Sequence, residues 1–219
     1  MKLAAEREAV AAACRRLAAE GVVIQTAGNV SVMAEDDLVV ITPTGGAFEE
    51  LEASQMTVVD RAGEVVDGQF APTSEIAIHL GVYDKFDQAR AVVHTHSPMA
   101  TALSCVVDEV PAVHYSMLMF GGPLKVAPYA TFGTEELAQN VLHALDGRTA
   151  CLMQNHGHVG YGHDLDYAVE TSLLAEWACT VYWRARAIGE PVALTGEQLQ
   201  DVAAQAMRLG YGMTKESDG

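Results

Sequence analysis

Basic residues are scarce in this chain of 219 residues. Only 13 Lys and Arg stand against 29 Asp and Glu, which gives a formal net charge of −16. A surface of this sign repels a phosphate backbone or an anionic bilayer, so we expect neither nucleic acid nor a membrane as a partner. An anionic ligand would need a site that is locally positive.

Close cysteine pairs and long apolar runs are missing as well. The four cysteines are scattered without a CxxC spacing and are expected to be reduced, buried thiols: Cys14, Cys105, Cys151 and Cys179. No run reaches the roughly 20 apolar residues of a membrane span, and the Ala-rich first 21 residues carry charges throughout, unlike a secretory signal. These absences predict a cytoplasmic protein.

No low-complexity linker divides the chain, so we expect residues 1–219 to form a single domain, with a flexible tail from about 211. Closely spaced β-type runs without intervening helices predict antiparallel pairing of residues 30–33, 38–42 and 57–60. Further strands are expected at residues 91–96 and on either side of a turn within 149–162. Helical patterns cover residues 2–20, 74–86, 134–145, 165–188 and 195–209. This order predicts an α/β fold of three layers, with helices around a central, mostly antiparallel sheet.

Two histidines stand one residue apart in the apolar run "VVHTHSPMA", residues 92–100. Residues two apart on a strand face the same side, so His94 and His96 can aim at one point while Val93 and Thr95 point away. That geometry suits a divalent metal. The competing interpretation is that each imidazole merely pairs with a polar neighbour, and two ligands do not make a site.

Other polar side chains could complete such a site. His156 follows an apolar strand at a polar tip that also holds His158, and either of the two could instead face solvent. Glu75 begins the helix before the histidine strand, where an acid is also ordinary compensation of the helix dipole. His79 lies on the same helical face as Glu75 and is either its partner or simply packed. Three imidazoles and one carboxylate would suit zinc.

Three short polar stretches offer a place for a phosphate: "TAGNVS" at 26–31, "TPTGG" at 42–46 and "PTSE" at 72–75. Backbone N–H groups and hydroxyls at such turns can hold an anion without lysine, together with a helix that Thr73 or Ser74 caps. Taken singly, each stretch is an ordinary turn.

Seven stretches in order along the chain resemble the class II aldolase and adducin family: "TAGNVSV", "ITPTG", "PTSE", "AVVHTH", "PAVHYSM", "APYATFGT" and "NHG". Within this family the likeness is greatest to aldolases of L-fuculose 1-phosphate. The resemblance implies that His94, His96 and His156 bind zinc and that Glu75 is both ligand and general base. It also implies a site for the substrate phosphate, formed by Asn29, Thr44, Gly45, Thr73 and Ser74.

The resemblance further implies that Tyr115 and Tyr211 act near the aldehyde, one of them across a subunit boundary of a homotetramer. The expected activity is zinc-dependent cleavage of a ketose 1-phosphate to dihydroxyacetone phosphate and a short aldehyde. L-Ribulose-5-phosphate 4-epimerase, a related dehydratase or decarboxylase, and a non-catalytic adducin-like module are the alternatives. The apolar run at 115–122 is read as core, although the family supports a subunit contact at its Tyr115 end.

Overall fold

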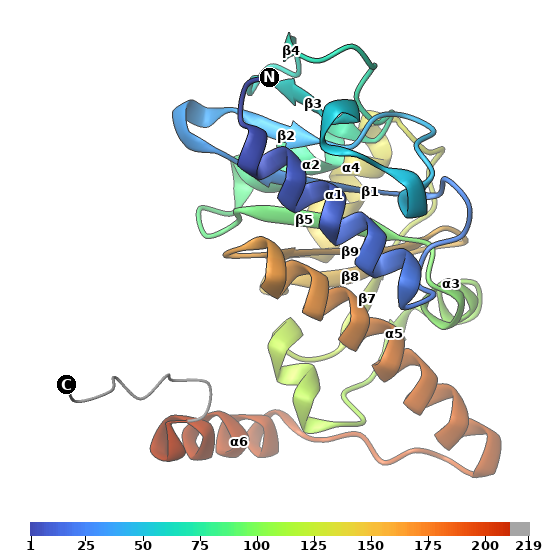
Figure 1. The fold of residues 1–219 in the computed structure, drawn as a ribbon. Helices are drawn as coiled ribbons and strands as arrows, with labels where there is room; N and C mark the ends of the chain where they lie inside the picture. Colours follow the sequence, from blue (N-terminus) through green and yellow to red (C-terminus); the bar gives the residue numbers. More distant parts are fainter. Residues whose placement is uncertain (211–219) are drawn as a thin grey trace.

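A computed structural model describes residues 1–210, whose six α-helices pack around one nine-stranded sheet (Figure 1). The α-helices of this part of the chain are α1 (Ala4–Ala19), α2 (Ile76–Lys85), α3 (Pro98–Ser104), α4 (Glu135–Ala144), α5 (Leu165–Ile188) and α6 (Gly196–Leu209). Its strands are β1 (Gly28–Met33), β2 (Val39–Ile41), β3 (Thr57–Val59), β4 (Val65–Asp67), β5 (Ala91–Thr95), β6 (Glu109–Val110), β7 (Leu124–Ala127), β8 (Ala150–Met153) and β9 (Gly157–Gly162).

The strands lie in the order β4-β3-β2-β1-β5-β9-β8-β7-β6. Among the described strands β7 and β8 pair in parallel and the other neighbours are antiparallel, which confirms the predicted mostly antiparallel sheet. The central strands β1, β5 and β9 come from distant parts of the sequence. Their register sets Asn29 beside His94, and His94 beside Val159.

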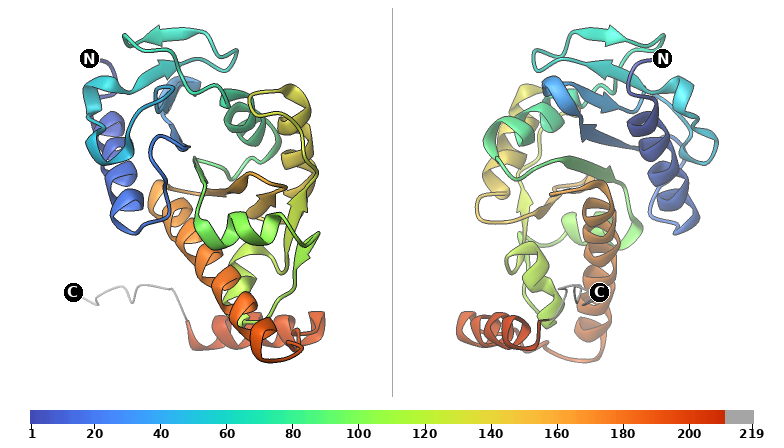
Figure 2. Two further views of the ribbon diagram at one scale, coloured as in Figure 1. Left: turned by 90° about the vertical axis from the view of Figure 1, so that its right-hand side faces the viewer. Right: turned by 60° about the vertical axis from the view of Figure 1, so that its left-hand side comes forward.

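Helices cover both faces of the sheet, as the sequence predicted. In Figure 1 the strands follow one another from top to bottom, with α1 and α5 in front of the sheet and α2 and α4 behind it, and Figure 2 shows the same layers from two other sides. One apolar core fills the space under α2 and α4, and a second lies under α1 and the start of α5. Both form because alternate strand residues face opposite layers: Val92 contributes to the first core, and Ala91 and Val93 to the second.

A third core extends the molecule beyond the central strands. It joins α3, the later part of α5, the start of α6 and a 3₁₀ segment, Tyr115–Phe120. Met117 and Phe120 are fully buried in it, which confirms the core interpretation for that part of the apolar run, whereas Tyr115 is exposed. Within the described residues, the sequence patterns missed α3 and the strands β4, β6 and β7, all of them short. Short elements carry too few residues to show a period.

Two local expectations were wrong. Cys105 is exposed at the end of α3, while the other three cysteines are buried and all four are free thiols. Helix α2 begins at Ile76, with Glu75 in the flanking position, rather than being capped by Thr73 or Ser74. The Thr73 N–H donates to the Thr42 carbonyl and thereby ties this segment to the end of β2, outside the helix.

No helix in residues 1–210 is long and apolar enough to cross a membrane.

Candidate metal centre

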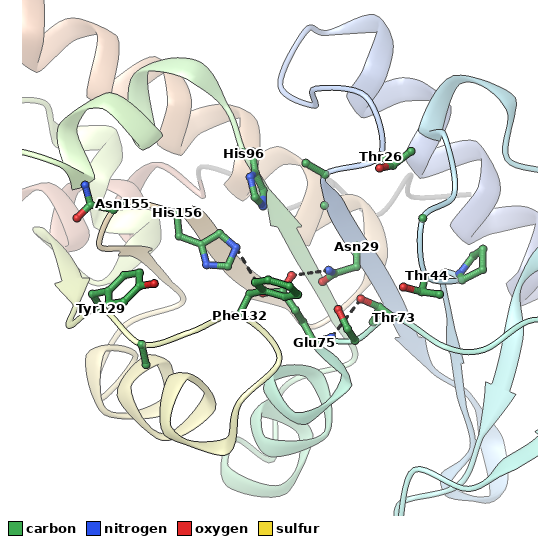
Figure 3. A pocket seen from close by; sticks show the side chains of 16 residues that line it. Thr26, Asn29, Thr44, Thr73, Glu75, His96, Tyr129, Phe132, Asn155 and His156 are labelled. Atoms are coloured by element: carbon green, nitrogen blue, oxygen red, sulfur yellow. Dashed lines mark hydrogen bonds and ion pairs between the residues drawn. The ribbon is translucent and has the colours of Figure 1, made fainter.

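Three separate segments bring the candidate ligands together at one edge of the central strands. His94 lies near the end of β5 and His96 just beyond it, while Glu75 sits immediately before α2. His156 comes from the turn between β8 and β9, where Asn155 takes a left-handed conformation with φ of 56° that Asn tolerates well. Figure 3 shows His96, His156 and Glu75 around a pocket, with Asn29 of β1 beside them.

The three imidazoles converge on one point. One ring nitrogen from each of His94, His96 and His156 lies within 4.8 Å of the others, and the Nε2 atoms of His94 and His96 are 2.9 Å apart. Two unprotonated nitrogens at that distance repel each other, so the pair requires a proton or a cation between them. The donor set, three imidazoles with a carboxylate close by, is one that suits zinc.

The Glu75 carboxylate completes the group of candidate ligands. Its Oε2 lies 3.1 Å from His94 Nε2 and accepts a hydrogen bond of 2.9 Å from the Asn29 amide. Its Oε1 lies 3.4 Å from His156 Nε2 and, among the described residues, has no hydrogen-bond partner although it is buried. A buried carboxylate oxygen without a donor, facing three imidazoles, fits a cation site.

One hydrogen bond determines which ring nitrogen His94 presents to the candidate site. Its Nδ1 lies 2.8 Å from the backbone carbonyl oxygen of His158, which can only accept, so Nδ1 carries the proton. The Nε2 atom is therefore the ring nitrogen that faces Glu75 and His96. A backbone carbonyl that fixes a histidine in this way is typical of metal sites in proteins.

Charge and burial set the ionisation of these groups. Burial by itself would raise the pKa of Glu75, but the charge and hydrogen bond of His94, together with His156 and Asn29, hold that pKa well below its usual range. Burial and the neighbouring histidines lower the pKa of His96 to about 3 and that of His156 to about 4. For His94, burial acts downward, but Glu75 and the His158 carbonyl outweigh it and raise the pKa. At neutral pH the site thus offers an ionised carboxylate and at least two neutral imidazoles.

The family resemblance of the sequence motifs is tested by comparison with known proteins. A sequence profile described as "Class II Aldolase and Adducin N-terminal domain" matches residues 8–183, which is well over half of the chain. This protein belongs to that family.

Relatives within the class II aldolase and adducin family match nearly end to end. The chain is 34% identical to a 5-deoxy-D-ribulose 1-phosphate aldolase of Bacillus thuringiensis serovar kurstaki, over 97% of this chain and 99% of the relative. It is 36% identical to an L-fuculose phosphate aldolase of Escherichia coli (strain K12), covering 87% and 88% of the two chains. A solved L-fuculose 1-phosphate aldolase superposes with a TM-score of 0.91 at 35% identity, covering 94% and 98%.

A pocket of about 450 Å³ lies beside His96 and His156. All the residues that the sequence predicted for the phosphate line it, together with Glu75, His96 and His156: Asn29, Thr44, Gly45, Thr73 and Ser74. Among the described residues, those lining the pocket include no Lys or Arg. A bound anion would therefore contact neutral hydroxyl and N–H groups, with its charge balanced by a metal.

The two tyrosines are not brought into this pocket by the described chain. Tyr115 is 55% exposed, its ring is tilted against that of His114 with 4.4 Å between centroids, and it does not line the pocket. Tyr211 lies outside the described residues. The structure instead places the exposed rings of Tyr129 and Phe132 at the pocket, and in Figure 3 Tyr129 appears on the side of His156, away from Thr44.

Sequence reasoning missed the role of the loop that carries Tyr129 and Phe132. Its letters, "APYATFGT", supported the family resemblance, but no residue in it was assigned to the site. Two aromatic residues in a turn-forming stretch were the available signal, since exposed aromatics often mark a binding surface. The alternative in which His156 or His158 faces solvent does not hold, because His158 is fully buried on β9 and the His156 side chain is only 12% exposed.

Proposed function

We propose that this protein is a zinc-dependent aldolase that reversibly cleaves a ketose 1-phosphate to dihydroxyacetone phosphate and a short aldehyde. The observation that carries the proposal is the convergence of His94, His96, His156 and Glu75. Of these, His96, His156 and Glu75 line a pocket that is also lined by small polar turn residues. Aldolases among the relatives support the same reaction class.

Different residues of the protein have different roles in the proposed reaction. Zinc held by the histidines would supply positive charge that stabilises the enediolate left when the carbon–carbon bond breaks. The turns at Thr44 and Thr73 hold the phosphate end through hydroxyl and N–H groups. In the condensation direction Glu75 takes the proton from the nucleophilic carbon, and its low pKa means that the carboxylate is ionised at neutral pH. Tyr115 or Tyr211 protonates the aldehyde oxygen.

The proposed enzyme is a homotetramer with its sites at subunit interfaces. In support of this, Tyr115 is exposed and outside the pocket of its own chain, so a role at the aldehyde requires it to reach a neighbouring subunit. Its neighbour Trp177 on α5 is 44% exposed and meets His114 edge to face.

The deciding experiment is cleavage of a panel of ketose 1-phosphates in the presence and absence of zinc. The panel holds L-fuculose, L-rhamnulose, 5-deoxyribulose and 5-methylthioribulose 1-phosphates, and epimerisation of L-ribulose 5-phosphate is assayed in parallel. We expect zinc-dependent release of dihydroxyacetone phosphate from at least one member. Epimerisation without cleavage would instead favour the epimerase, and a stable protein that purifies without metal and binds none would favour an adducin-like module.

A further inference from the structure

A chain of buried hydrogen bonds runs from the core to the Glu75 carboxylate. The Tyr83 hydroxyl lies 2.7 Å from Ser31 Oγ, and Ser31 Oγ lies 2.7 Å from His79 Nδ1. His79 Nε2 lies 2.5 Å from Asn29 Oδ1, and Asn29 Nδ2 lies 2.9 Å from Glu75 Oε2. Ser31 and His79 are fully buried, and Tyr83 nearly so.

The direction of each hydrogen bond in this series follows from the direction of the preceding one, starting at the Glu75 carboxylate. An ionised Glu75 only accepts, so the Asn29 amide nitrogen faces it and the amide oxygen faces His79. That oxygen also only accepts, so His79 donates from Nε2. Burial lowers the pKa of His79 to about 3, so the ring is neutral and its Nδ1 accepts from Ser31. Ser31 then accepts from the Tyr83 hydroxyl.

Asn29 is the point at which this buried chain meets the pocket. Its amide nitrogen has two N–H groups, of which one donates to Glu75, and the residue itself lines the pocket. His79, Ser31 and Tyr83 do not line the pocket. If the amide turned over, its oxygen would face the carboxylate and its nitrogen would face the His79 N–H, so both contacts would become repulsive. The hydrogen bond from His79 therefore stabilises the amide orientation in which Asn29 donates to Glu75.

We propose that His79 is a positioning residue of the site: its Nε2–H locks the Asn29 amide in the orientation that holds the Glu75 carboxylate toward the three histidines. The role rests on the proposed function only in that Glu75 contributes to holding the metal. Among the described residues, His79 does not line the pocket and hydrogen-bonds to none of the three histidines, so its hydrogen-bonded link to the site passes through Asn29.

Zinc affinity, measured by competition with a chelator, tests this role without an activity assay. His79→Leu keeps the size and apolar packing of the side chain but removes the donor, and it should bind zinc about tenfold more weakly, as is common when a partner of a metal ligand is lost. His79→Gln places an amide N–H near the position of Nε2 and should bind close to the wild-type affinity. His79→Asn reaches only to the position of Nδ1 and should behave like the Leu variant.

Tyr83→Phe is the matched control, because it removes a hydrogen bond at the far end of the same chain and leaves His79 and Asn29 paired. It should lose thermal stability yet keep its zinc affinity. Wild-type affinity in His79→Leu, or an equal loss in Tyr83→Phe, would overturn the positioning role while leaving the proposed aldolase intact. A wild-type protein that binds no zinc would overturn both.

Discussion

Each histidine near the candidate metal centre has different surroundings, and these decide what its ring can do. His94 is anchored through Nδ1 by a backbone carbonyl and so presents Nε2 to the site. His79 is held on both nitrogens and serves as a link between Ser31 and Asn29. His158 is fully buried, and neither of its ring nitrogens has a hydrogen-bond partner in residues 1–210. His94, His79 and His158 are all buried, but their ring nitrogens differ in what they can bind and in how they affect stability.

Glu75→Gln tests the proposed base. The amide has nearly the size of the carboxylate but cannot take a proton, and the three histidines remain as ligands. We expect the variant to retain zinc, measured by elemental analysis, and to lose at least about 100-fold of the exchange of the dihydroxyacetone phosphate C–H with solvent deuterium, followed by NMR. The exposed Glu136 supplies the control, since Glu136→Gln should exchange normally. Normal exchange in Glu75→Gln would remove Glu75 from the base role.

His158→Leu should stabilise the metal-free protein. The substitution removes two buried ring nitrogens that lack partners, and we expect the free energy of unfolding at neutral pH to rise by about 1 kcal/mol. Burial and the charge of His94 lower the pKa of His158 to about 3, so in the folded protein it stays neutral where the unfolded chain takes up a proton. Wild-type stability is therefore lost as pH falls from about 6.5 toward 3.

Urea denaturation at pH 7.5 and pH 5 measures this effect. Removal of His158 should shrink the loss of stability between the two pH values by about 2 kcal/mol, since one such group contributes about 1.4 kcal/mol per pH unit below its unfolded pKa. His163→Gln is a control at an exposed histidine and should leave the difference unchanged. An unaltered pH dependence in His158→Leu would show that the ring is not buried in neutral form.

At the scale of elements, the site depends on how closely β5 and β9 approach where they end. Gly157 opens β9 directly after His156, and a Cβ added there would overlap the Thr95 carbonyl oxygen and press on His96. On the other side of β5, a Cβ on Gly28 would lie 2.9 Å from the His94 carbonyl oxygen. Glycines at these two points allow three strands to meet with their ligands in register.

Gly157→Ala should therefore damage both the sheet and the metal site. The added methyl meets backbone, which cannot move aside as a side chain does, and we expect a loss of about 3 kcal/mol in the free energy of unfolding. Zinc affinity should fall as well, because the shift displaces His156 from His96. Gly196→Ala at the start of α6 is the comparison, since no atom lies within 4 Å of its added Cβ. Equal stability of the two variants would contradict the close approach.

At the scale of the whole molecule, several exposed apolar side chains among the described residues lie on α5 and α6. Trp177 and Trp183 of α5 are 44% and 50% exposed, and Met207 of α6 is 81% exposed. Apolar side chains gathered in one part of a surface are typical of contacts between subunits. The high negative charge of each chain acts against association, so contacts of this kind have to outweigh repulsion.

Light scattering after size-exclusion chromatography tests the assembly. We expect a mass of four times the chain mass of 23.3 kDa. Added salt screens the repulsion between the acidic chains, so the tetramer should persist to lower protein concentration at high salt than at low salt. Trp183→Glu should shift the mass toward smaller species, whereas Glu136→Gln on α4 should not. A single-chain mass for the wild type at all salt concentrations would rule out sites shared between subunits.

The amino-acid sequence alone determined the alternation of helices and strands, and it marked His94, His96, His156 and Glu75 as chemically unusual. It could do so because periods of two and 3.6 residues and local turn chemistry are properties of neighbouring residues. The direction of β7 and the capping of α2 could not be predicted from the sequence, since both depend on partners far along the chain.

Only the tertiary structure decided which polar groups meet. Asn29 and His94 are 65 positions apart and become neighbours through the register of β1 and β5, and His79 reaches Asn29 because α2 packs behind those strands. The same packing buried His158 and turned Tyr115 outward. Hydrogen-bond partners and burial depend on how the layers of the fold stack. The physical reason is that sheet register and helix packing bring together residues that are distant in the sequence, and no local pattern encodes these contacts.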